Sequence, residues 1–118
     1  MTMDPLKFVQ MELRAKELVN AFRAKNGKPP LEINLKFAFA AQEHSENEGA
    51  QGKMTHDGFQ DRAQASGANK ENVALGQKSI EEVVQTWINS PGHRKNILDA
   101  KREVAVGNDN GHWTMLLA

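Results

Sequence analysis

The chain has 118 residues, which is enough for one domain with its own hydrophobic core. Fifteen Lys and Arg residues balance fifteen Asp and Glu residues, and no basic stripe stands out, so nucleic acid is not expected as a partner. No apolar run approaches the roughly 20 residues of a membrane-spanning helix, and the absence of cysteine excludes disulfides, thiolate metal ligands and thiol redox chemistry.

Apolar periodicity predicts a first helix over Pro5–Lys25. Apolar residues recur there at three- and four-residue steps, and proline suits a first helical turn because its missing N–H is not needed there. A second helix is predicted over residues 34–48. Its predicted apolar side comprises Leu35, Phe37, Ala38, Phe39 and Ala41. A glycine-rich loop then leads to a short helix over Phe59–Ser66, which ends at Gly67.

The second half of the chain predicts one helix between short strands. Ser79 and Glu82 form a capping-box pattern that begins this helix, and Pro91 ends it. Strands are predicted at residues 73–75, 103–106 and 113–117, and an Asn-Asp-Asn-Gly turn at residues 108–111 joins the last two. These last two strands are apolar at successive positions, as in a sheet that is covered on both faces.

Together these elements predict an α+β fold. The expected architecture is a three-layer α-β-α sandwich with a small antiparallel sheet between helices, because the helices before and between the strands can supply both covering layers. All of residues 1–118 are predicted to form this single domain.

Two histidines lie in glycine-flanked segments. His56 is followed by Asp57 and Gly58, and His93 directly follows Pro91-Gly92. Proline cannot extend the preceding helix and glycine adopts backbone angles that other residues resist, so we expect a rigid turn to project His93. Neutral imidazole is a good ligand for zinc or copper, which makes the pair candidate metal ligands.

Three segments resemble, in this order, the CAP superfamily, which comprises cysteine-rich secretory proteins, antigen 5 and pathogenesis-related class 1 proteins. They are the segments around His56 (54–59), after Glu71 (71–76) and around His93 (87–98). Residues 41–45 and 112–115 match as well, so the resemblance runs from about Leu18 to Ala118. It is closest to the short bacterial-type SCP-like domains, and it implies the same α-β-α sandwich.

The resemblance implies that His56 and His93 face a common cleft, with Glu71 beside them. Ser90 stands where fuller members of the family carry a second acid. The two histidines are then the expected ligands of a divalent metal such as zinc, and Glu71 is expected to orient one ring. Two histidines with water bind zinc less tightly than three protein ligands, so we expect weak zinc binding that folding does not require, and no other cofactor.

Further polar residues near these segments are predicted to have supporting roles. Asn72 is expected to support Glu71 by bridging neighbouring backbone, and Arg94 and Asn96 to fix the turn after His93. His44 is expected to pack locally on its helix, and His112 to lie at the surface.

The function predicted from these residues is a non-enzymatic CAP-domain binding or interaction module, whose partner is an unidentified protein or small apolar ligand. One alternative is a hydrolase, either metal-dependent or using Ser90 with His93. Ser90 before Pro91 is more simply a helix terminator, and no Gly-x-Ser-x-Gly elbow is present, so no catalytic residue is predicted. Another alternative is sterol or lipid binding, which the short, charged segment 98–102 disfavours.

The sequence leaves the cellular location and the oligomeric state open. The resemblance predicts an extracellular, cell-surface or periplasmic domain, and residues 1–10 lack the basic start and apolar stretch of a signal peptide, so the signal would have been removed from this chain. A cytoplasmic location is the alternative, because neither a signal nor a cysteine is seen.

Overall fold

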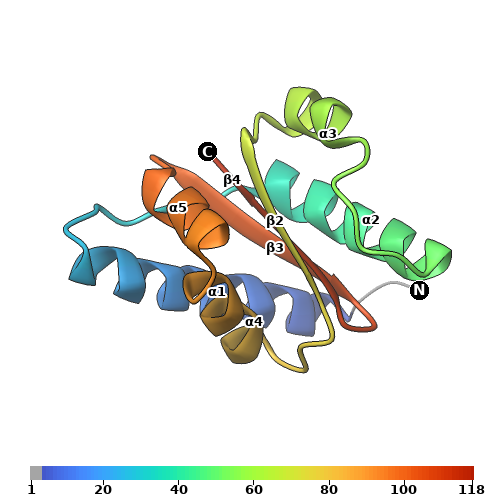
Figure 1. Ribbon diagram of the computed structural model, residues 1–118, viewed down its shortest axis with the longest axis horizontal. Helices are drawn as coiled ribbons and strands as arrows, with labels where there is room; N and C mark the ends of the chain where they lie inside the picture. Colours follow the sequence, from blue (N-terminus) through green and yellow to red (C-terminus); the bar gives the residue numbers. More distant parts are fainter. Residues whose placement is uncertain (1–3) are drawn as a thin grey trace.

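Residues 4–118 are described by a computed structural model, and their strands form one mixed sheet (Figure 1). The strands are Glu32–Ile33 (β1), Lys70–Leu75 (β2), Glu103–Asp109 (β3) and His112–Leu117 (β4). Their order across the sheet is β1-β3-β4-β2, which places β2 at one edge. β1 runs parallel to β3, and the other neighbouring strands are antiparallel. The sequence did not predict β1, and this strand adds the one parallel pair found within residues 4–118.

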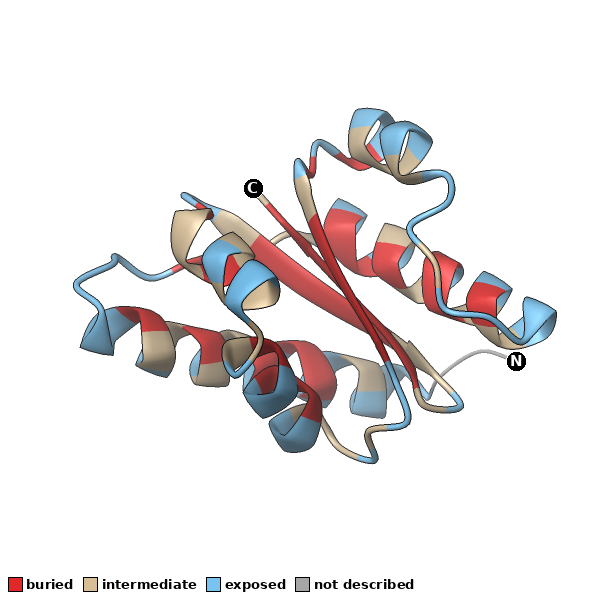
Figure 2. Cartoon of the chain, viewed as in Figure 1, coloured by how far each residue is buried: buried red, intermediate tan, exposed pale blue. Residues whose placement is uncertain are grey.

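The sheet lies between two layers of helices, which confirms the predicted α+β sandwich. The helices are Pro5–Lys25 (α1), Leu35–Gln51 (α2), Phe59–Ser66 (α3), Ile80–Ile88 (α4) and Pro91–Asp99 (α5). α1, α4 and α5 cover one face of the sheet, and α2 and α3 lie on the other side (Figure 1). Alternate strand residues face the two layers, so Val104 and Val106 pack with the first and Ala105 with the second. Burial is concentrated on the sheet and on the helix sides that face it (Figure 2).

The helices α1 and α3 have the bounds that the sequence predicted, and α2 extends past residue 48 to Gln51. Only part of the predicted apolar side of α2 is buried. Leu35 and Phe39 are 62% and 65% exposed, because the buried stripe of α2 follows helical spacing through Phe37, Ala41 and Ser45. No helix within residues 4–118 is long and apolar enough to cross a membrane.

The segment around Pro91 differs from the sequence prediction. Ser79 begins α4 as expected, since its Oγ accepts a hydrogen bond from the Glu82 N–H at 3.1 Å. α4 ends at Ile88, but Pro91 then begins α5, with Ser90 as its N-cap residue. The prediction that a rigid turn projects His93 is therefore wrong. Proline suits the first position of a helix as well as the end of one, and His93 lies in the first turn of α5. The segment 98–102, expected to be a loop, begins with the last two residues of α5.

The backbone of α2 lies directly against β3 at Gly107. A Cβ atom at this position would stand 2.4 Å from the Ala41 carbonyl carbon and from the Gln42 nitrogen, a separation that no side chain tolerates. Glycine is thus required here by close approach of two backbones. This contact lets α2 lie deep on the sheet.

Side chains of α1 and α2 cover the edge of β3 that β1 leaves open. β1 pairs only with Glu103 and Val104. Beyond them, the Gln42 amide donates to the Asn108 carbonyl at 2.8 Å and accepts from its N–H at 2.9 Å. The Val106 N–H donates to Oε1 of Glu12 at 2.8 Å. These bonds satisfy main-chain groups that a longer β1 would otherwise pair.

We predict that Gly107→Ala destabilises the domain by about 3 kcal/mol or more, because overpacking a fixed backbone contact costs at least the usual 1–3 kcal/mol. Urea unfolding measures the loss. Gly92→Ala is the matched control, since a Cβ there has no neighbour within 4 Å. Equal stability of the two variants would show that α2 shifts freely on β3.

Glu12 makes stability depend on pH. Burial raises the pKa of Glu12 from 4.5 to about 8, and the hydrogen bond from Val106 lowers it by less. Between these two pH values the folded protein binds a proton that the unfolded chain has lost. The contribution of Glu12 to the free energy of unfolding is therefore full below pH 4.5 and falls as the pH rises to about 8.

We predict that Glu12→Gln removes this loss, so its stability relative to the wild type rises by roughly 3–4 kcal/mol from pH 4.5 to pH 7.5. Urea unfolding across this range provides the measurement. Glu17→Gln, an exposed change on the same helix, serves as the control. A difference between wild type and Glu12→Gln that stays constant with pH would contradict the assignment.

Candidate functional site

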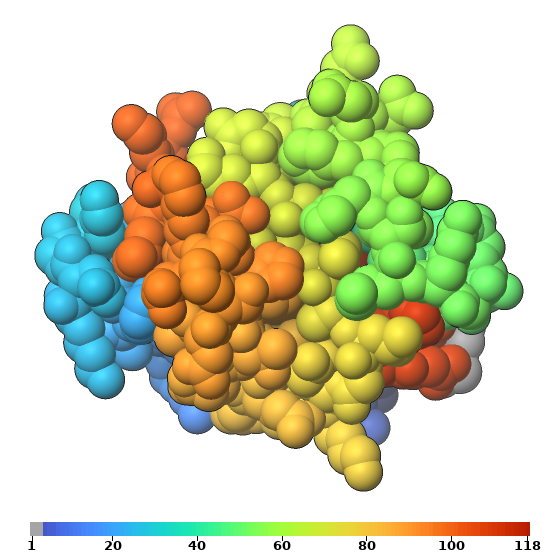
Figure 3. Space-filling view, in the orientation of Figure 1, coloured from blue at the N-terminus to red at the C-terminus, as the bar shows by residue number. Residues whose placement is uncertain are grey.

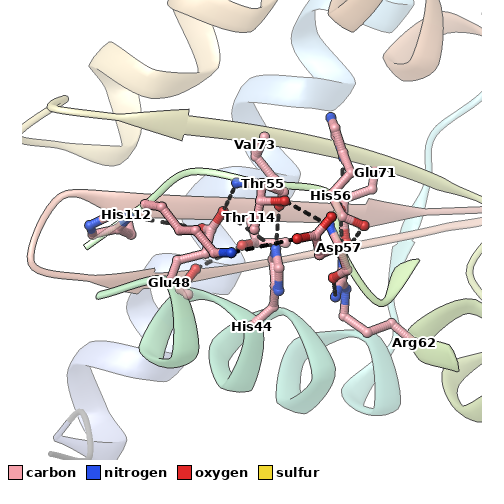
Figure 4. A network of polar contacts seen from close by, with 12 residues as sticks. His44, Glu48, Thr55, His56, Asp57, Arg62, Glu71, Val73, His112 and Thr114 are labelled. Carbon is pink, nitrogen blue, oxygen red and sulfur yellow. Dashed lines mark hydrogen bonds and ion pairs between the residues drawn. The ribbon is translucent and has the colours of Figure 1, made fainter. Parts of the chain in front are cut away.

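Glu71 of the edge strand β2 is the centre of a buried ionic cluster (Figure 4). Its carboxylate is 1% exposed. Arg62 of α3 binds both oxygens, with Nη2 at 2.7 Å from Oε1 and Nε at 2.7 Å from Oε2. Nδ1 of His56 lies 2.9 Å from Oε1. The bidentate guanidinium compensates a charge that would be costly to bury alone.

This cluster sets the orientation and the tautomer of His56. Carboxylate oxygens accept hydrogen bonds, so Nδ1 of His56 is the donor to Glu71 and carries the ring proton. The lone pair of the neutral ring is then on Nε2. The His56 side chain is 56% exposed, so this nitrogen can meet a ligand. A carboxylate behind a histidine is the arrangement that orients metal-binding imidazoles.

His93 lies on the other side of β2, in the first turn of α5. Its ring is half-buried, and Nδ1 is shielded from solvent with no hydrogen-bond partner among residues 4–118. Burial lowers the pKa of His93, and the nearby charge of His56 lowers it further. The ring is therefore neutral at neutral pH, the form in which imidazole binds metals.

The predicted supporting residues fix α5 against β2. The Asn96 amide donates to Oδ1 of Asn72 at 2.8 Å, and the Asn72 amide donates to the His93 carbonyl at 3.2 Å. Arg94 donates to the Ile88 carbonyl at 3.2 Å, which ties α5 to the end of α4. Asn72 thus holds the α5 backbone rather than loop backbone. Adjacent residues of a strand point to opposite faces, so Glu71 and Asn72 serve the two sides of β2.

The edge strand therefore joins the two halves of the candidate site. Figure 3 shows the segment that includes β2 (yellow) between the loop and α3 (green) on one side and α5 (orange) on the other. Ser90 caps the start of α5 by its backbone position and makes no side-chain capping bond. Within the described residues, Ser90 makes no side-chain hydrogen bond to His93. The structure thus brings Glu71 into contact with His56, while Ser90 and His93 approach from α5.

A second polar cluster lies beneath the loop that carries His56, and the sequence reasoning missed most of it. It contains His44 and Glu48 of α2 and His112 of β4, all buried (Figure 4). His44 was expected to pack on its own helix, and in the structure its Nε2 also bonds the Thr55 carbonyl of the loop at 2.7 Å. The expectation that His112 lies at the surface is wrong, because Leu75 and α2 flank its position in the sheet. The four-residue spacing of His44 and Glu48, which places them on one helical face, was the available signal.

Residues 4–118 contain no group of three or more His, Asp or Glu side chains arranged to hold a metal ion. Both oxygens of Glu71 are engaged by Arg62, so Glu71 is not free to be a third ligand. A zinc ion at His56 and His93 would have two protein ligands and water, which fits weak binding and not a structural site.

Comparison with known proteins decides the family. The family model of the cysteine-rich secretory protein family, CAP, matches residues 16–107. The chain belongs to the CAP family. The uncharacterized protein YkwD of Bacillus subtilis is 36% identical over 107 residues, which cover 83% of this chain and 42% of YkwD. This membership confirms the resemblance that the three sequence segments indicated.

Solved structures share the fold of this CAP domain. An extracellular SCP-domain protein of Bacillus anthracis matches with a TM-score of 0.83 and 25% identity, over 99% of this chain and 44% of that one. An outer surface protein of Borrelia burgdorferi matches with a TM-score of 0.77 and 20% identity, over 99% and 96% of the two chains. This chain spans less than half the length of YkwD and of the B. anthracis protein.

We predict that Arg62→Ala destabilises the CAP domain by about 3–5 kcal/mol, because it leaves the buried Glu71 carboxylate without its cation. Adding Glu71→Gln should recover at least about 1 kcal/mol, because a neutral amide is less costly to bury than an unpaired charge. Urea unfolding of the wild type, both single variants and the double variant measures this coupling. Strictly additive losses would show that Arg62 stabilises α3 by packing alone.

Proposed function

We propose that this CAP domain is a non-enzymatic binding module whose cleft binds a divalent metal such as zinc through His56 and His93. The observation that carries the proposal is the Glu71–His56 bond, which fixes the ring and leaves Nε2 as an exposed ligand. His93 supplies a second neutral imidazole, because burial lowers its pKa and the nearby charge of His56 lowers it further.

The same contacts argue against a hydrolase. Glu71 is poorly suited to act as a general base, because its buried carboxylate is neutralised by the bidentate Arg62 and also accepts a hydrogen bond from His56. A serine nucleophile needs a base within hydrogen-bond reach, and Ser90 makes no such bond to His93 within residues 4–118. A hydrolytic zinc site uses three protein ligands and an open position, one ligand more than this site offers.

The partner of such a module is proposed to be a protein or a small apolar ligand outside the cell. Two proteins of similar structure are described as an extracellular protein and an outer surface protein, which supports an extracellular or surface location for this domain. Sterol or lipid binding has less support, because the segment 98–102 is short, charged and partly helical.

We predict weak zinc binding by the wild type and at least a tenfold loss of affinity in both His56→Ala and His93→Ala, because each removes one of two protein ligands. Isothermal titration calorimetry at neutral pH gives the affinities. Circular dichroism should show that both variants remain folded without metal. Binding should also fall in acid, because protons compete for the imidazoles.

Equal zinc affinity of wild type and His93→Ala would show that the metal binds elsewhere. The same samples should be assayed on general peptide and ester substrates, with and without zinc. Turnover that disappears in His93→Ala would replace the binding module by the hydrolase.

A further inference from the structure

Both main-chain polar groups of Thr55 are held by side chains of α2. The Thr55 N–H donates to Oε2 of Glu48 at 2.7 Å, and the Thr55 carbonyl accepts from Nε2 of His44 at 2.7 Å. The His44 and Glu48 side chains are 5% and 1% exposed. These two short, part-buried hydrogen bonds satisfy both main-chain groups of a loop residue that has no helix or strand partner.

His44 and Glu48 act on Thr55 as one unit. They lie one helical turn apart on α2, with Nε2 of His44 at 3.4 Å from Oε2 of Glu48. The Nε2–H of His44 thus faces both the Thr55 carbonyl and the Glu48 carboxylate, which fixes the His44 ring. We call this pair, with its two bonds to Thr55, the Thr55 clamp.

The clamp stands on a rigid base. The residue after His44, Ser45, shares a buried hydrogen bond with Thr114 of β4 at 2.8 Å between the hydroxyl oxygens. Earlier on the same helix, Gln42 is bonded to Asn108, and the α2 backbone touches Gly107. α2 is therefore fixed on the sheet both before and after His44 in the sequence. The clamp thus holds the loop in a fixed position relative to the sheet.

Thr55 immediately precedes His56, and the loop around them has no helix or strand of its own. On the other side of His56, Arg62 donates to the Asp57 carbonyl at 2.6 Å. The Thr55 clamp thus fixes the residue before His56, Arg62 fixes the residue after it, and Glu71 fixes the His56 ring. Without the clamp, the loop could move away from β2 and lengthen the His56–Glu71 bond.

The clamp is retained at a cost to stability. Oε1 of Glu48 has no hydrogen-bond partner among the described residues, nor has Nδ1 of His112, and these two buried atoms face each other at 4.0 Å. Burying an acceptor that lacks a partner destabilises the folded state. An apolar residue at position 48 would avoid this cost but would leave the Thr55 N–H without its acceptor, so the hydrogen bond from Thr55 is what Glu48 contributes here.

We infer that His44 and Glu48 are positioning residues for His56. They hold Thr55 so that Nδ1 of His56 meets Glu71 and the ring keeps Nε2 free for a ligand. The inference rests on the proposed function only in taking His56 as a ligand of the metal. The geometry that His44 and Glu48 impose on His56 can be tested without metal.

The test compares Glu48→Leu, which removes the acceptor for Thr55, with Glu48→Gln, which keeps it. Nitrogen-15 NMR reports the fraction of His56 in the Nδ1–H tautomer, and hydrogen exchange reports protection of the Thr55 amide. In Glu48→Leu we expect Thr55 to exchange at least about tenfold faster, a mixed His56 tautomer, and about tenfold weaker zinc binding. Glu48→Gln should restore the tautomer and bring Thr55 exchange to within about threefold of the wild type.

Glu43→Leu is the matched control, because it makes the same change at an exposed position of α2. It should leave the tautomer and the Thr55 exchange unchanged. If Glu48→Leu does not fold, His44→Leu and His44→Gln make the same comparison at the Thr55 carbonyl, since glutamine keeps a donor.

A wild-type tautomer and unchanged Thr55 exchange in the leucine variant would overturn the inference. So would a glutamine variant as impaired as the leucine variant, because charge rather than the bond to Thr55 would then matter. Absence of zinc binding in the wild type, together with the expected NMR changes, would refute the proposed metal function and support the positioning role.

Discussion

The close contact between α2 and β3 at Gly107 is the constraint on which the rest of this CAP domain depends. With no side chain at Gly107, the helix backbone reaches the strand, and Gln42 reaches Asn108 to satisfy the open strand edge. The same helix carries the Thr55 clamp. A shift of α2 away from β3 would therefore disturb the sheet edge and the loop of His56 together.

The edge position of β2 explains how one strand serves both sides of the candidate site. Its neighbouring residues point to opposite faces, so Glu71 meets Arg62 and His56 while Asn72 holds the start of α5. The contacts of the candidate site thus follow from the alternation of side chains along β2 as much as from residue type.

Three buried glutamates show different solutions to one electrostatic problem. Glu71 is paired with a bidentate arginine and orients a histidine. Glu12 has its pKa raised to about 8, so it is neutral at neutral pH, and it covers a strand edge. Glu48 bonds the loop with one oxygen and leaves the other unpartnered beside His112. Glu71 thus has the compensation that a buried charge requires, Glu12 avoids the charge, and Glu48 leaves one buried oxygen without a partner among the described residues.

Local signals in the sequence determined the elements that depend on neighbouring residues. Helical periodicity gave the bounds of α1, Gly67 gave the end of α3, and Ser79 with Glu82 gave the start of α4, because these patterns are local in the sequence. The Asn110-Gly111 pair, with φ of 48° and 82°, forms the predicted hairpin turn. The three family segments, also read from the sequence, indicated the CAP fold and the candidate cleft residues.

Tertiary structure decided what depends on distant partners. β1 exists because two residues pair with β3, and no local sequence pattern predicts this pairing. Pro91 fits a helix end and a helix start equally well, so only packing of α5 against β2 places His93 on a helix. The burial of His112 and Glu48 arises from α2 lying on β4, a contact between residues 64 positions apart (112 − 48). Periodicity in a sequence gives the face of an element, whereas the partner of that face is set only when the layers pack.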